Sequence, residues 1–118
     1  MSTFSYTMTI KAPTGTASET IEALVDTGST FMTVPAEVLE RLGVMAHRVV
    51  RLRLAHGRTD ERRVGRVFAR LNGLEEEILC VFGGPQDIPT IGAHTLEAFL
   101  LGVDRLRKRL VPVDALWV

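Results

Sequence analysis

An internal disulfide is excluded in this chain, because its 118 residues contain a single cysteine, Cys80. That cysteine lies in the apolar run 78–82. A thiol in such surroundings is typical of a buried structural residue rather than a nucleophile. We therefore do not expect cysteine chemistry or an oxidising compartment.

Net charge is also absent, since 14 basic residues balance 14 acidic ones. The molecule as a whole thus has no electrostatic reason to bind nucleic acid or an anionic membrane. No window approaches the roughly 20 apolar residues of a membrane-spanning helix. The first residues, MSTFSYTMTIKA, lack the basic start and apolar stretch of a secretory signal. We expect a cytoplasmic protein without a membrane partner.

The length and the 46% hydrophobic content predict one folded domain over residues 1–118. Apolar and polar residues alternate along much of the chain, which favours strands. Two short helices are predicted over 36–42 and 93–101, ended by Gly43 and Gly102. Strands are predicted over 4–10, 17–25, 50–54, 67–71 and 78–82, with closing strands at Val103 and 110–113. The expected class is all-β with one or two short helices.

The segment 23–30, Ala-Leu-Val-Asp-Thr-Gly-Ser-Thr, contains the candidate chemistry. A carboxylate directly after an apolar strand is costly unless it is hydrogen-bonded or functional. Gly28 allows a sharp turn and a close backbone approach, and the hydroxyls of Thr27 and Ser29 can donate to Asp26. The alternative is a plain turn, in which Asp26 caps its own loop. The four residues 26–29 alone do not decide between these interpretations.

This segment resembles the active-site loop of retropepsin-like aspartic peptidases, where two apolar residues precede Asp-Thr-Gly and then Ser, Thr or Ala. In that family a second signature, an apolar pair and a glycine that opens a helix, lies far downstream. Residues 90–96 with Gly92 stand in that place, about 65 residues after Asp26. The order of elements also matches over essentially the whole chain. The resemblance is closest to small, soluble, single-domain prokaryotic members, and it implies the closed β-barrel of an acid-protease half.

Four departures from the family pattern concern substrate range more than fold. Thr90 replaces the first apolar residue of the downstream signature, and His94 stands where an acidic or amide residue is more common. The segment between the two signatures lacks a glycine-rich tip of the retroviral kind. Tyr6, the only tyrosine, lies in the first predicted strand, so the flap tyrosine of two-domain pepsins has no equivalent.

Acid-protease chemistry needs two carboxylates that share a proton, one acting as a base on water and the other as an acid. The chain has one Asp-Thr-Gly. The second carboxylate must then come from a twofold mate, with the site on the axis. The resemblance thus implies a homodimeric endopeptidase that hydrolyses peptides or proteins through a water activated by two Asp26 side chains, without cofactor or metal.

The resemblance also assigns roles to single residues. Asp26 is the catalytic carboxylate, Thr27 braces the two loops across the axis, and Gly28 contacts substrate. Ser29 donates to the outer oxygen of Asp26. Gly92 opens the downstream helix, and residues 53–61 form a flap over the substrate, with a tip made of Ala55, His56, Gly57 and Arg58. Trp117 is expected at the dimer contact.

Two other functions stay open. One is a catalytically silent dimer of the same fold that serves binding or assembly, although an intact Asp-Thr-Gly-Ser favours the enzyme. The other is a small barrel for single-stranded nucleic acid, suggested by eight arginines between Arg48 and Arg70. Arg51 and Arg53 alternate with leucines, as on a solvated strand face, and only Phe68 interleaves as an aromatic. The three histidines show no metal-ligand spacing: His47, His56 and His94.

Overall fold

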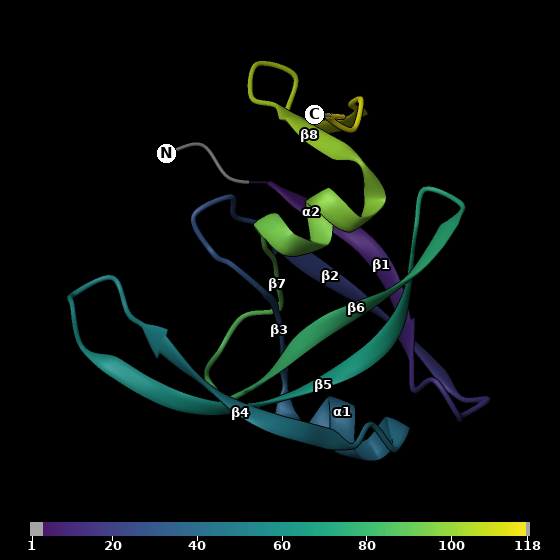
Figure 1. Ribbon diagram of the computed structural model, residues 1–118. Helices are drawn as coiled ribbons and strands as arrows, with labels where there is room; N and C mark the ends of the chain where they lie inside the picture. The colour runs from purple at the N-terminus through teal and green to yellow at the C-terminus, as the bar shows by residue number, and fades with distance from the viewer. Residues whose placement is uncertain (1–3, 118) are drawn as a thin grey trace.

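The computed structural model describes residues 4–117, so the ends of the predicted domain, residues 1–3 and 118, lie outside the described part. Strands dominate the fold, as the alternating pattern predicts, and two short helices interrupt them (Figure 1). The elements are β1 (Ser5–Lys11), β2 (Ser18–Val25), β3 (Met32–Pro35), α1 (Ala36–Leu42), β4 (Ala46–Arg53), β5 (Thr59–Leu71), β6 (Leu74–Gly83), β7 (Thr90–Ile91), α2 (Ala93–Phe99), β8 (Leu101–Asp104) and β9 (Arg109–Pro112).

One barrel-like sheet contains seven of these strands, in the order β1-β2-β7-β3-β6-β5-β4. β1 also pairs with β5, which brings the two sides of the sheet together around a core. β4 continues the sheet beyond β5 and leaves the main body as one arm of a long hairpin (Figure 1). β8 and β9 form a separate two-stranded hairpin. This confirms the all-β class with two short helices.

The core is formed by the inward face of each strand. Ile10 in β1 pairs with Ala69 in β5. Both belong to the core together with Met8 and Val67, and each of the four is at most 1% exposed. The predicted apolar strand 78–82 lies within β6, between β3 and β5. Cys80 is fully buried there, and burial raises the pKa of its thiol far above the ordinary range. The predicted burial of this thiol is confirmed.

Helix α1 has the predicted bounds. It ends at Gly43, whose φ of +82° places it in the left-handed region, and the Gly43 N–H donates to the carbonyl oxygen of Glu40 at 3.0 Å. Glycine adopts this conformation without the cost that a Cβ imposes. The position at which α1 ends is therefore determined by the local sequence.

Helix α2 is shorter than predicted, because it ends at Phe99 rather than continuing toward Gly102. Leu100 takes the left-handed position at φ +54°, and its carbonyl oxygen accepts a hydrogen bond from Val113 N–H at 2.9 Å. Gly102 lies in β8, where a Cβ would come within 2.8 Å of the Val113 side chain. The absence of a side chain at Gly102 thus allows Val113 to pack closely against β8. The residue does not end the helix.

No helix in residues 4–117 is both long enough and apolar enough to cross a membrane.

Candidate active site

The loop after β2 holds Asp26 at a junction of strands. Leu24 and Val25 pair in parallel with Thr90 and Ile91 of β7. The Asp26 N–H donates to the Ile91 carbonyl oxygen at 3.0 Å, which carries the pairing one residue past the strand. The backbone of Asp26 is thus fixed by a segment that lies far downstream in the chain.

The carboxylate of Asp26 is half-buried and accepts a hydrogen bond from the Gly28 N–H, with 2.9 Å between nitrogen and Oδ1. The Ser29 N–H donates to the Asp26 carbonyl oxygen at 3.1 Å. The loop is therefore an Asx-type turn, as the plainer interpretation of the sequence predicts, and this turn also orients the carboxylate. Thr27 and Gly28, at the outermost part of the loop, are exposed.

The bond predicted from the Ser29 hydroxyl to Asp26 is not present in residues 4–117. The backbone N–H of Gly28 donates to the Asp26 carboxylate instead, because the turn directs this N–H toward it. Ser29 contributes through its carbonyl oxygen, which accepts from the Ala93 N–H at 2.7 Å.

The first turn of α2 clamps the same loop from behind. The N–H groups of Ala93 and His94 donate to Ser29 and Thr30 at 2.7 and 2.8 Å. Gly92, which precedes the helix, is buried, and a Cβ there would lie 2.6 Å from the Phe31 carbonyl oxygen. The two motifs singled out in the sequence are thus in direct backbone contact.

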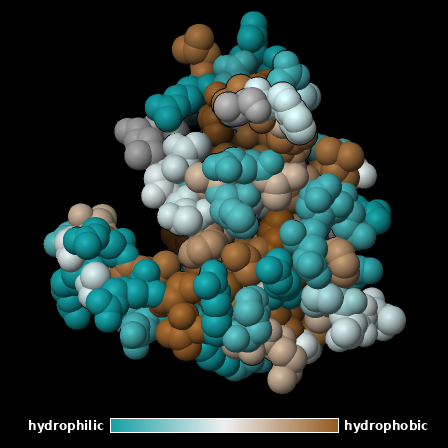
Figure 2. All heavy atoms as spheres, viewed as in Figure 1, coloured by the Kyte–Doolittle hydropathy of each residue, from teal (hydrophilic) through white to brown (hydrophobic). Residues whose placement is uncertain are grey.

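The predicted flap is the far end of the β4–β5 hairpin. Its tip residues are all exposed, and Gly57 has a φ of +90°. The tip is closed by bonds from Leu54 N–H to the Arg58 carbonyl oxygen at 2.7 Å and from Gly57 N–H to that of Leu54 at 2.9 Å. In Figure 2 the hairpin projects from the body as an arm, and a hollow with apolar atoms at its base separates the two.

Sequence reasoning missed a charged group on the half-buried face of this hairpin. Arg62 donates from Nε to Asp60 Oδ2 at 2.9 Å and from Nη1 to Asp87 Oδ2 at 3.0 Å. The hydrogen bond from the Arg62 guanidinium is the main reason why the pKa of Asp60 lies below its usual value. The pKa of Asp87 is lowered by the Gly84 N–H first and by Arg62 as well. The available signal was the i, i+2 spacing of Asp60 and Arg62, which puts both on one strand face.

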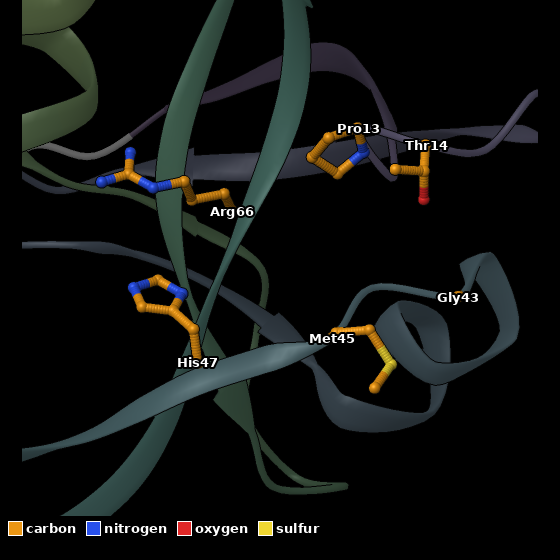
Figure 3. Close-up of a pocket in the computed structure, with 6 residues that line it drawn as sticks. All are labelled: Pro13, Thr14, Gly43, Met45, His47 and Arg66. Carbon is orange, nitrogen blue, oxygen red and sulfur yellow. The ribbon is translucent and has the colours of Figure 1, made fainter.

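A separate pocket of about 380 Å³ opens elsewhere on the surface (Figure 3). It is lined by Pro13, Thr14, Gly43, Met45, His47 and Arg66, and none of these is a predicted site residue. In residues 4–117 no group of three metal-ligating side chains comes together. His94 instead meets Phe31 edge to face, with 5.9 Å between the ring centroids.

Residues 12–104 match the family model described as aspartyl protease, which covers most of the chain. The chain belongs to the aspartyl protease family. This agrees with the resemblance carried by the Asp-Thr-Gly-Ser segment and by the region of Gly92, both of which lie inside the matched range. No curated protein matches the sequence at the level that counts as significant.

Solved structures of similar fold include retroviral proteases. The solution structure of simian foamy virus (mac) protease is 18% identical, with a TM-score of 0.57 over 80% of this chain and 92% of that one. The EIAV protease in complex with the inhibitor HBY-793 is 15% identical, with a TM-score of 0.58 over 81% and 86%. At such identities the likeness shows the fold, and the fold is retropepsin-like.

Proposed function

We propose that this protein is an aspartic endopeptidase that is active as a homodimer, with one Asp26 from each chain in a shared site. The observation that supports it most is the presentation of the Asp26 loop. β7 and α2 hold the loop from behind, its carboxylate is oriented by Gly28, and its outermost residues are exposed in the single chain. A loop so firmly held and yet open on one side suits a symmetric partner.

In the proposed reaction the two Asp26 carboxylates share one proton, because two such groups at close range cannot both be ionised. The ionised Asp26 takes a proton from a water molecule as the water oxygen bonds to the scissile carbonyl carbon. The protonated Asp26 gives its proton to the carbonyl oxygen. The Asp26 that took the water proton then gives it to the nitrogen, while the other Asp26 takes a proton from one hydroxyl of the diol. The C–N bond breaks, and the amine and the carboxylic acid leave. No cofactor or metal takes part.

The supporting roles follow the family pattern with one change. Thr27 is exposed, so its hydroxyl is free to reach the partner's loop across the axis. Gly28 has no side chain and leaves its backbone open to substrate. The orienting hydrogen bond to Asp26 is assigned to the Gly28 N–H rather than to the Ser29 hydroxyl.

Substrate is proposed to lie between the flap and the body as an extended peptide. The flap tip comprises Ala55, His56, Gly57 and Arg58, and all four residues are exposed. Ile88, in the segment before β7, is 65% exposed and adds apolar surface near the loop that supports Asp26. Peptides with apolar side chains around the cut are therefore the favoured substrate class.

Exposed apolar residues near the C-terminus support self-association. Leu116 and Trp117 are 94% and 98% exposed, and Leu106 in the β8–β9 turn is 96% exposed. Burial of such side chains between two copies is favourable at roughly 25 cal/mol per Å². We place Trp117 at the dimer contact, and we propose a single-domain enzyme of the cytoplasm.

Nucleic-acid binding is less well supported than peptide hydrolysis. Four of the eight arginines between positions 48 and 70 lie within 4 Å of carboxylates, which reduces their availability to phosphates: Arg62, Arg63, Arg66 and Arg70. Charges of both signs interspersed on an exposed surface favour solubility, which accounts for these arginines without a nucleic-acid partner.

The proposal is tested with a peptide library and pepstatin. The purified protein should cleave peptides with a bell-shaped, acid-shifted pH profile, since the shared-proton state exists between two macroscopic pKa values of the pair. Pepstatin should block the cleavage. Pepstatin binding without any cleavage would favour the silent dimer, and activity that rises into alkaline pH would point to another nucleophile.

A further inference from the structure

The half-buried face of the flap hairpin carries fixed charges. Asp60 and Arg62 of β5 lie opposite Leu52 and Val50 of β4, and these four residues are all partly buried. The outward neighbours Arg51, Arg53, Glu61 and Arg63 are exposed. Arg62 is thus directed to the body side of the hairpin, with 31% of its side chain exposed. An arginine at such a place needs partners, and it has two.

One of these partners belongs to a different part of the chain. Asp87 lies in the segment 84–89, between β6 and β7. Its Oδ2 accepts both from Arg62 Nη1 at 3.0 Å and from the Gly84 N–H at 2.7 Å. The Asp87 N–H also returns a bond to the Gly84 carbonyl oxygen at 3.1 Å. Arg62 therefore contacts a closed turn whose shape is already fixed.

This turn leads directly to the support of Asp26. Pro89, two residues after Asp87, accepts a hydrogen bond from the Leu24 N–H at 2.8 Å, and Thr90 pairs with Leu24 in β2, the strand that leads to Asp26. A displacement of segment 84–89 relative to the flap would change the space between the flap and the catalytic loop.

Arg62 is also the outermost attachment of the hairpin. From Val64 onward β5 enters the core, where Val64 is fully buried. In residues 4–117, no side-chain hydrogen bond joins residues 50–61 to a segment outside the β4–β5 hairpin, since Asp60 bonds only to Glu61 and Arg62 within it. The ion pair between Arg62 and Asp87 is therefore the side-chain contact nearest the flap tip that joins the hairpin to another segment, and it is placed to limit flap movement.

We propose that Arg62 is a positioning residue that ties the flap to segment 84–89 and so sets the width of the substrate cleft. The inference deepens the proposed peptidase function and rests on it. Arg62 does not touch the reacting atoms. Its loss leaves the Asp26 pair intact but lets the flap open more often, so that bound peptide is held less tightly.

The first test measures amide hydrogen exchange and does not depend on peptide cleavage. Arg62→Ala should raise exchange about fivefold both in residues 50–61 and in residues 84–90, the order expected when a partly exposed ion pair is lost. Asp87→Asn keeps an oxygen for the Gly84 N–H but removes the charge, and it should raise exchange in residues 50–61, on the opposite side of the contact.

The matched control is Arg41→Ala. Arg41 forms a two-contact pair with Glu19, at 2.9 and 2.8 Å, between α1 and β2 and away from the flap. Its loss should leave exchange in residues 50–61 unchanged. If Arg62→Ala and Asp87→Asn both leave the flap amides as in the unsubstituted protein, or if Arg41→Ala changes them equally, the positioning role is refuted.

The second test separates binding from chemistry in the active enzyme. Arg62→Ala should raise KM about fivefold with little change in kcat, and Arg62→Lys should recover part of the loss, since an ammonium group makes one of the two contacts. A fall in kcat of about fivefold with KM unchanged would contradict the proposal. A protein that shows the exchange effect but cleaves no peptide would refute the peptidase function alone.

Discussion

Gly92 and Ser29 touch through their backbones: a Cβ added to Gly92 would lie 2.7 Å from the Ser29 carbonyl oxygen. That same oxygen accepts the first N–H of α2, from Ala93, at 2.7 Å. The close contact lets a helix start directly behind the Asp26 loop, and it explains why a glycine is needed at a position with ordinary extended backbone, φ −99° and ψ −177°.

Gly92→Ala should therefore destabilise the protein although alanine tolerates that backbone. The new methyl meets backbone atoms of Phe31 and Ser29, which cannot rotate away, and overpacking of this kind costs about 1–3 kcal/mol. Urea denaturation measures the free energy of unfolding. Gly15→Ala is the control, since its Cβ would have no neighbour nearer than 3.4 Å. Equal stability of the two variants would contradict the prediction, because it would mean that the Ser29–Phe31 backbone moves away from the new methyl group at little cost.

The flap tip should be dispensable for folding but not for turnover. Residues 55–58 are exposed, so replacement of the tip by a two-residue Asn-Gly turn removes no core contact. We expect an unchanged thermal midpoint and a loss of peptide cleavage of about a hundredfold or more, because the closed flap is what positions substrate. Normal cleavage by the shortened protein would show that the hairpin is not a flap.

Asp87 should make the stability of the protein depend on pH in a defined direction. The Gly84 N–H, and after it Arg62, hold the pKa of Asp87 below its usual 3.8 in the folded state. A carboxyl with a lowered folded pKa stabilises the protein above its unfolded pKa, and this contribution is lost as the pH falls through the folded value. The tie to the flap thus persists at mildly acidic pH.

The corresponding measurement compares the free energy of unfolding of the parent protein and Asp87→Asn between pH 7 and the acid limit. The difference should be constant above about pH 5 and should shrink below about pH 4. A difference that grows on acidification would contradict the assigned direction.

Self-association should depend on the exposed C-terminal residues. Sedimentation at micromolar concentration should return about twice the 13.0 kDa of one chain. Trp117→Ser should weaken the dimer about tenfold, since large aromatic side chains dominate interface energies. Leu74→Ser, at the exposed β5–β6 turn and 54% accessible, is the control and should leave the dimer intact. A fully active monomer would contradict the shared site.

The predictable features are those encoded locally. Alternation reveals β1 and β2, and Gly43 marks the end of α1, because each depends on a few consecutive residues. The Asp26 loop and Gly92 were found through their motifs. The Asx turn was anticipated as well, but as an alternative to function, whereas the structure shows that it orients the carboxylate.

The features that were missed depend on distant partners. β3 and β7 contain four and two residues, too few for a period to be recognised, and they exist as strands because β2 and β6 flank them. The ion pair between Arg62 and Asp87 joins positions 25 residues apart in the sequence, and no local pattern indicates it. The end of α2 was misplaced because the hydrogen bond from Val113 sets the conformation of Leu100.

The shared site is tested most directly by a mixed dimer. Asp26→Asn preserves the size of the side chain and the acceptor for the Gly28 N–H, so the variant should fold and dimerise without activity. Differently tagged parent and Asp26→Asn chains can be co-expressed, and the heterodimer isolated by tandem purification. One ionisable carboxyl cannot serve as both acid and base, so the heterodimer should have less than about 1% of the parent rate. A heterodimer that keeps about half of the parent rate would show that each chain works alone, and it would contradict a site built from two Asp26 residues.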